Sequence, residues 1–399
     1  MSRSHHIIPT LEDISRPVRV FDALTTVREV VDIFQKDPSL LALPIADEGR
    51  FLGIVNRKTL FFQRLGRQFA MELYGKRPIR ELLDESHVVM EPERDINAAL
   101  ATLLEADPAL GTDSFPVVSG GLCLGIVAVS DLMMKISESQ AHLLSTLHCL
   151  SARIREEVDK ASKIQHDLLP PPEYRFDALA VSAEVVTSSE IGGDFYDYVF
   201  LDDGRLVLVV ADVSGHGVQS GMVTTAAKAS LHTLIAQGVT TPSRLLRAMN
   251  NAILATARQT LLMTCQVAVI DQRGGSITLA NAGHNFPYLY RKESDEVTMI
   301  TDVAGYPLGF EENSSYEECA LPFLAGDTLF LYTDGVVECR DSNGEEFGYG
   351  RLEAVLRGEM DRPPTQVKQR VMEATTHFTG TRSFDDDVTL LITSFQPTT

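Results

Sequence analysis

Residues 136–168 most restrict how this 399-residue chain can fold, because they contain neither proline nor glycine. A heptad frame runs through them, and eight of its ten a and d positions are apolar. The a positions are Ile136, Leu143, Leu150, Glu157 and Ile164, and the d positions are Gln140, Leu147, Ile154, Ala161 and Leu168. A helix of about 33 residues would be roughly 50 Å long. Pro170, Pro171 and Pro172 cannot continue it.

So narrow an apolar seam suits two helices wound around each other, which predicts a parallel homodimer. Residues 137–171 would then be a linker and dimerisation helix between a domain at 1–136 and a domain at 172–399. The alternative is a monomer in which the apolar stripe packs on the chain's own domains.

An internal repeat fills the first part of the chain. The segment LPIADEGRFLGIVNRKTL begins at Leu43, and FPVVSGGLCLGIVAVSDL begins 72 residues later at Phe115. A helix-like stretch that ends in Asp-Pro precedes each copy. Each half is therefore predicted to contain a helix, a strand, a turn, a strand and a helix that opens near Thr59 or Asp131.

This tandem unit resembles a pair of CBS domains (cystathionine beta-synthase domains), whose clefts often bind adenine nucleotides. The second copy keeps Gly125 and Asp131 of the family's Gly-x-x-Thr/Ser-x-x-Asp pattern but has Ala128 at the hydroxyl position. The resemblance implies that Asp131 contacts the ribose of an adenine nucleotide. The competing interpretation is that Asp131 caps the helix that follows.

The composition excludes several classes of protein. A formal net charge of −20, from 55 acidic and 35 basic side chains, argues against binding to nucleic acid or to an anionic membrane. The five cysteines are scattered and form no C-x-x-C pair, which argues against a disulfide framework or a zinc site. With no signal-peptide pattern and no run of 18 apolar residues, we expect a cytoplasmic protein.

After the prolines, acidic residues recur where predicted strands begin or end. Asp212 ends the apolar run VLVVAD, Asp334 follows TLFLYT, and Asp194 follows two glycines. Asp385, Asp386 and Asp387 precede the final strand. Buried carboxylates need compensation. Mg²⁺ and Mn²⁺ take such oxygen ligands, and two ions that share one carboxylate can activate a water for attack on a phosphoryl group.

The motifs of residues 161–395, in order, resemble those of the SpoIIE-type branch of the metal-dependent PPM (type 2C-like) serine/threonine phosphatases. They are ASKIQHDLLPPP, IGGDFYDY, ADVSGHGVQSGM, LANAGHNFPYLY, GYPLG, GDTLFLYTDGVVECRDSNGEEFGYGRL and FDDDVTLL. The resemblance implies an α+β fold, an α-β-β-α sandwich with two antiparallel sheets. We also expect helices over Val218 to Gln237 and Pro242 to Arg258.

The resemblance also implies the ligands of two Mn²⁺ or Mg²⁺ ions. Asp212 would bridge both ions, the backbone carbonyl of Val213 would add a ligand, and Asp194 would serve the second ion directly or through water. Asp334 and Asp386 would hold the first ion; Asp386 is preferred to its two neighbours because Thr389 fixes the frame of the motif. His216, His284 and Asn281 are expected to hold loops, and we identify no arginine as a phosphate clamp.

The predicted function is a metal-dependent phosphoserine/phosphothreonine protein phosphatase, regulated through the CBS pair by a nucleotide or a partner. Within the family, the substrate is often a phosphorylated anti-sigma-factor antagonist of the STAS type. Two alternatives stay open: a catalytically silent module that senses nucleotides and binds a phosphoprotein, and a phosphohydrolase of nucleotides or other small molecules.

Overall fold

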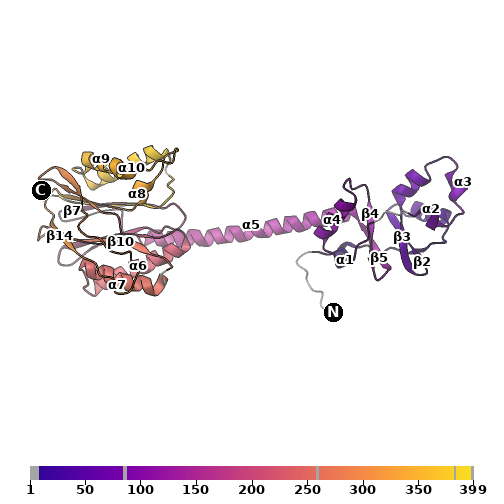
Figure 1. Cartoon of the computed structure of the whole chain (residues 1–399), viewed down its shortest axis with the longest axis horizontal. Helices are drawn as coiled ribbons and strands as arrows, with labels where there is room; N and C mark the ends of the chain where they lie inside the picture. The colour runs from indigo at the N-terminus through magenta and orange to yellow at the C-terminus, as the bar shows by residue number, and fades with distance from the viewer. Residues whose placement is uncertain (1–8, 84–87, 258–259, 382, 397–399) are drawn as a thin grey trace. The chain divides into compact units, whose positions relative to one another are not determined.

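The computed structural model describes residues 9–83, 88–257, 260–381 and 383–396. The chain divides into two compact units, Met1–Ala152 and Arg153–Thr399. The boundary falls within the long helix α5, Val129–Asp167 (Figure 1).

Helix α5 is the predicted long helix, but it begins at Val129 and so includes the helix that was expected separately near Asp131. No proline or glycine lies between Val129 and Asp167 to separate the two. The predicted seam is open to solvent along the middle of the helix, where four of its side chains are more than half exposed: Leu143, Leu147, Leu150 and Ile154.

The first unit contains the predicted repeat. Its first half comprises α1 (Leu11–Ile14), β1 (Phe21–Asp22), α2 (Val27–Lys36), β2 (Ala42–Asp47), β3 (Arg50–Asn56), η1 (Thr59–Arg64), α3 (Ala70–Tyr74) and η2 (Ile79–Leu82). Its second half comprises α4 (Ile96–Ala106), β4 (Ser114–Ser119) and β5 (Leu122–Ala128). The antiparallel pairs β2–β3 and β4–β5 both change register at corresponding points, between Ile45 and Ala46 and between Val117 and Val118. The 72-residue repeat is therefore also a repeat of structure.

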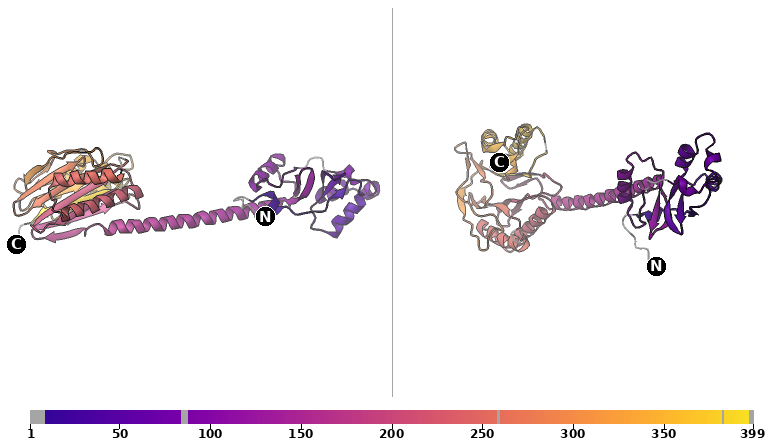
Figure 2. Two further views of the ribbon diagram at one scale, coloured as in Figure 1. Left: turned by 90° about the horizontal axis from the view of Figure 1, so that it is seen from below. Right: turned by 45° about the vertical axis from the view of Figure 1, so that its right-hand side comes forward.

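The second unit contains two antiparallel sheets (Figure 2). One has the order β14 (Cys319–Pro322), β11 (Ser276–Ala282), β10 (Met263–Asp271), β9 (Arg205–Val213) and β8 (Phe195–Phe200). The other has the order β13 (Glu296–Met299), β12 (Tyr288–Arg291), β15 (Thr328–Tyr332), β16 (Val388–Phe395), β7 (Leu179–Val186) and β6 (Glu173–Phe176).

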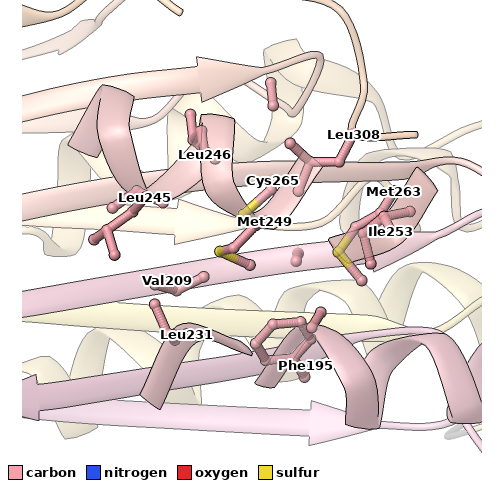
Figure 3. Packing of buried hydrophobic residues seen from close by; sticks show 14 of the residues in the cluster. Phe195, Val209, Leu231, Leu245, Leu246, Met249, Ile253, Met263, Cys265 and Leu308 are labelled. Carbon is pink, nitrogen blue, oxygen red and sulfur yellow. The ribbon is translucent and has the colours of Figure 1, made fainter. Parts of the chain in front are cut away.

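Helices cover the outer face of each sheet, which confirms the predicted α-β-β-α sandwich. Helices α6 (Val218–Ala236) and α7 (Pro242–Ala257) pack on the five-stranded sheet through a core that includes Leu231, Met249 and Cys265 (Figure 3). Helices α8 (Gly335–Glu338), α9 (Gly348–Glu359) and α10 (Pro364–Thr379) cover the other sheet. Both predicted helices of this region are present, although Arg258 lies outside the described residues.

The alternation of side chains along β9 explains how the layers form. Leu206, Leu208 and Val210 enter the core between the sheets, whereas Val207 and Val209 pack against the helices. Successive side chains of a strand point to opposite faces. Asp212 is therefore in phase with the residues between the sheets, at the point where β9 ends.

Candidate active site

Four separate segments bring carboxyl groups to the same end of the sandwich. Asp194 immediately precedes β8, and Asp212 lies near the end of its neighbour β9. In the opposite sheet, Asp334 lies just beyond β15, and Asp386 lies just before the adjacent strand β16. The fold therefore gathers acidic residues that are far apart in sequence.

The pKa values of these carboxyls show that they act on one another. Burial, followed by the charges of Asp334 and Asp386, raises the pKa of Asp212 to about 7. Burial and the neighbouring Asp212 raise the pKa of Asp194 well above its usual value. Burial and Asp386 raise the pKa of Asp334. The negative charges are thus held together against their mutual repulsion, as expected for a site that binds cations.

Two threonines anchor one oxygen of Asp194. The hydroxyls of Thr333 and Thr389 both donate to Oδ2 of Asp194, each at 2.7 Å. The Thr333 hydroxyl also accepts the backbone N–H of Thr389 at 2.9 Å. The two threonines fix the orientation of the Asp194 carboxyl group, and neither of them bonds to its other oxygen, Oδ1. Sequence analysis gave neither threonine this role.

Asp387 has a structural role that its neighbours do not share. Its buried carboxylate accepts the backbone N–H groups of Ser188 at 2.7 Å, Gly193 at 2.6 Å and Asp194 at 3.3 Å. These bonds fasten the loop that carries Asp194. Asp386 is exposed, and its charge acts on Asp212 and Asp334. This arrangement favours Asp386 over Asp387 as a ligand, but the assignment stays a prediction.

Substituting the two neighbouring aspartates separately should distinguish these roles. We expect Asp386→Asn to lose activity and metal affinity without a change in melting temperature, because its side chain is exposed. Asp387→Asn should lower the free energy of unfolding by about 1–3 kcal/mol, because it weakens hydrogen bonds to a buried charged group. Thermal melts and metal titrations of both variants measure the difference. The reverse pattern would exchange the two assignments.

Helix α5 reaches this loop through Gln165. Its side-chain Nε2 donates to the carbonyl oxygen of Gly192 at 2.8 Å, and its Oε1 accepts the N–H of Gly192 at 3.2 Å. Two residues further along, Asp194 enters the acidic cluster. The next glycine is equally confined, since a Cβ on Gly193 would lie 2.7 Å from the carbonyl oxygen of Val213. Sequence analysis missed the contact of Gln165, because no local pattern encodes a bond between residues 27 positions apart.

Asn281 and His284 hold a loop, as expected, whereas the role expected of His216 stays a prediction. Asn281 accepts the N–H of His284 at 2.7 Å and donates to its carbonyl oxygen at 2.9 Å, which closes the turn. The His284 ring hydrogen bonds to the Thr264 hydroxyl at 2.8 Å, and burial lowers the pKa of His284 to about 4. His216 is exposed between Gly215 and Gly217, which both have positive φ.

The donor set fits hard divalent cations, which prefer carboxylate and carbonyl oxygens. Asp194, Asp212, Asp334 and Asp386 offer the carboxylates, and Val213 offers a carbonyl that faces the loop of Gly193. Within the described ranges, however, no three His, Cys, Asp or Glu side chains are grouped as they would be around an ion. The ligand assignments therefore stay predictions.

Asp131, the residue expected to contact a nucleotide, lies in the first turn of α5 and pairs with another side chain. Nη2 of Arg16 lies 2.7 Å from Oδ2 of Asp131, and the Asp131 side chain is 15% exposed. Arg16 thus already pairs with the carboxylate that was expected to contact a ribose, and the nucleotide contact stays a prediction.

Comparison with known proteins finds a family match in each unit of the chain. Residues 202–396 match the family model of stage II sporulation protein E (SpoIIE), and residues 11–65 match the CBS domain. Phosphoserine phosphatase RsbU of Bacillus subtilis is 27% identical over 253 residues, which cover 63% of this chain and 72% of RsbU. Phosphoserine phosphatase RsbP of the same organism is 26% identical over 242 residues, 58% of this chain and 56% of RsbP.

Solved structures agree on the fold. The SiaA-PP2C domain of Pseudomonas aeruginosa, 24% identical, has a TM-score of 0.54, with 62% of this chain and 99% of that domain covered. The RsbU and RsbW domains of Rv1364c from Mycobacterium tuberculosis, 25% identical, have a TM-score of 0.50, with 56% of this chain and 61% of that one covered. In the described part of the chain, no helix is long and apolar enough to span a bilayer. Residues 11–65 are thus similar to a CBS domain, and residues 202–396 are similar to the phosphatase domain of the SpoIIE family.

Proposed function

We propose that this protein removes phosphate from phosphoserine or phosphothreonine of a partner protein, with two Mn²⁺ or Mg²⁺ ions. The observation that carries the proposal is that four segments bring carboxyls to one end of the sandwich, near enough to shift one another's pKa values. The relatives RsbU and RsbP are named phosphoserine phosphatases, which supports the same substrate class here. From the family resemblance, the substrate is a phosphorylated anti-sigma-factor antagonist of the STAS type.

In this proposal Asp212 would serve both ions, Asp334 and Asp386 would hold the first, and Asp194 would serve the second. The carbonyl of Val213 would add a ligand. Two such ions would activate a water as nucleophile and neutralise charge on the phosphoryl group. The protein's own contribution is to orient the carboxyls: Thr333 and Thr389 fix Asp194, and Asp387 fixes its loop.

Phosphate release, measured with and without Mn²⁺, tests the proposal. We expect Mn²⁺-dependent release from a phosphoserine STAS protein and much slower release from free nucleotides. Faster turnover of nucleotides would favour the small-molecule phosphohydrolase. Binding of the phosphoprotein with no release at any metal concentration would favour the silent binding module.

The open seam of α5 supports a homodimer in which a second copy of the helix covers Leu143, Leu147, Leu150 and Ile154. Association would remove these apolar side chains from water. Light scattering of the full chain at micromolar concentration tests this part of the proposal, and a monomer would contradict it.

The bidentate contact of Gln165 with Gly192 supports regulation through α5. A signal at the CBS pair would act on the metal site if it favoured one of two positions of the helix. We expect Gln165→Ala to weaken Mn²⁺ binding by about tenfold, because it removes both hydrogen bonds between α5 and Gly192. Mn²⁺ titration calorimetry measures the change.

Ser151→Ala, an exposed position of the same helix, serves as the matched control and should bind Mn²⁺ as the unmodified protein does. If Gln165→Ala lowers the melting temperature but leaves Mn²⁺ affinity unchanged, the contact is structural only. The regulatory proposal also includes an adenine nucleotide that binds at the CBS pair. Calorimetry with AMP, ADP and ATP tests it directly, and an absence of heat with all three would remove it.

A further inference from the structure

The segment GYPLGF, residues 305–310, forms a loop that is fixed to the phosphatase core. Leu308 is fully buried at its centre, and its backbone exchanges two hydrogen bonds with the backbone of Met263, at 2.7 and 3.0 Å. The side chain of Asn250, also fully buried, accepts the N–H of Gly309 at 2.8 Å. The loop is therefore held in place by its backbone and by one apolar side chain.

The pairing of β10 places this loop near the predicted metal ligands. Met263, the first residue of β10, pairs with Leu308 on one side and with Val213 on the other. Because neighbouring strands lie about 4.8 Å apart, the backbones of Leu308 and Val213 are about 10 Å from each other. Val213 directly follows Asp212.

A second set of contacts gives the same position. A Cβ on Gly283 would lie 2.9 Å from the ring of Pro307, so the loop packs directly against the turn that contains Gly283. The next residue, His284, hydrogen bonds through its ring to the Thr264 hydroxyl at 2.8 Å. Thr264 is the register partner of Asp212. The loop thus borders the end of the sandwich at which the acidic residues gather.

Two aromatic side chains of this loop, Tyr306 and Phe310, are exposed. Tyr306 is 59% exposed and Phe310 is 45% exposed, and their rings stack with centroids 4.9 Å apart and 18° between the planes. Since Leu308 and Asn250 already anchor the loop, its position does not require these rings to lie at the surface. Large apolar groups that gather at an exposed site mark surfaces for interaction. We call Tyr306 and Phe310 the aromatic pair.

Acidic side chains border the aromatic pair. Glu311 and Glu312 directly follow Phe310, and both are exposed. A surface that covers the pair must therefore offer an apolar patch with lysine or arginine at its edge. A second copy of this chain fits poorly, because a symmetric contact would bring its own Glu311 and Glu312 to the same place. A different protein with a basic border fits better.

We infer that the aromatic pair binds the surface of the phosphoprotein substrate beside its phosphorylated residue. The inference rests on the proposed phosphatase function and adds the chemistry of the partner's surface, an apolar patch bordered by basic side chains. Aromatic side chains often supply most of the binding energy of an interface, and a loop fixed before binding loses little conformational entropy. The aromatic pair would thus favour a protein substrate over a small phosphate ester.

The test compares the double variant Tyr306→Ala/Phe310→Ala with the unmodified full-length protein in Mn²⁺. The substrates are a phosphoserine STAS protein and p-nitrophenyl phosphate. We expect the double variant to raise KM for the phosphoprotein by about 30-fold, the scale of an interface hot spot. Its constants for p-nitrophenyl phosphate should stay close to those of the unmodified protein, because this ester brings no protein surface. Tyr306→Phe, which keeps the ring, should retain the low KM.

Leu324→Ala is the matched control. Leu324 is 49% exposed in the turn before β15, at the opposite end of that strand from Asp334, so its loss should leave all constants unchanged.

Three results would overturn the inference. The first is an unchanged KM for the phosphoprotein in the double variant. The second is an equal loss with both substrates, which would mean that the loop positions the metal site. The third is dissociation of an oligomer by the double variant in light scattering, which would assign the aromatic pair to a contact between copies. If the unmodified protein releases no phosphate from either substrate, the proposed function itself fails.

Discussion

Replacing Asp212 by asparagine is expected to lower the rate of phosphate release by about three orders of magnitude or more. Burial and the charges of Asp334 and Asp386 raise the pKa of Asp212, so this carboxyl interacts with the acids of the opposite sheet. It is also the carboxylate proposed to be shared by both ions. Steady-state release of phosphate from a phosphoserine protein, measured across a range of Mn²⁺ concentrations, provides the test.

The loss should not come from unfolding. Without metal, Asp212→Asn removes one of several repelling charges from a buried site, so its melting temperature should equal or exceed that of the unmodified protein. Asp203→Asn, the same exchange in the exposed turn before β9, should leave activity intact. Full activity of Asp212→Asn would refute the role given to this residue.

A second large effect is expected from Gly335→Ala. A Cβ at this position would lie 2.0 Å from the backbone carbonyl oxygen of Asp387. That carbonyl precedes β16, which is paired on both sides and cannot yield easily. The segment of Asp334 must therefore move away from Asp386. We expect activity to fall about 100-fold, the scale of a misplaced reacting group, and the free energy of unfolding to fall by about 1–3 kcal/mol.

Urea denaturation and phosphatase assays measure these two losses. Gly358→Ala is the matched control, since a Cβ there meets nothing within 4 Å and the residue is exposed on α9. It should keep full activity and gain up to about 1 kcal/mol from better helix propensity. If Gly335→Ala behaves like this control, the close approach of the two acidic segments is not required for catalysis.

The repeat and the sandwich could be predicted from the sequence because their signals are regular. The two register changes, one in each strand pair, are separated by the same 72 residues as the two sequence repeats. The beginning of α5 could not be predicted as readily. Nothing in the local sequence separates the last helix of the repeat from the long helix, and the two are continuous.

The residues that support the acidic cluster were harder to find than its acids. Thr333 and Asp387 hydrogen bond to residues 139 to 199 positions away, and no local pattern reveals such pairs. The alternation of side chains along a strand did offer one indication of the role of Asp387. Leu391 lies between the sheets, and Thr389 and Asp387 are in phase with it. That phase directs Asp387 inward and could have distinguished it from Asp386.

The end of α5 and the residues that follow it are held by several hydrogen bonds to the phosphatase unit. After Gln165, the carbonyls of Pro170 and Pro171 accept the hydroxyls of Tyr196 at 3.0 Å and Tyr198 at 2.7 Å, both on the strand that follows Asp194. The segment from Gln165 to Pro171 is therefore held at both ends, by Gly192 before Asp194 and by the tyrosines after it. An insertion within this segment would break one of the two sets of contacts and would release one side of the loop that carries Asp194.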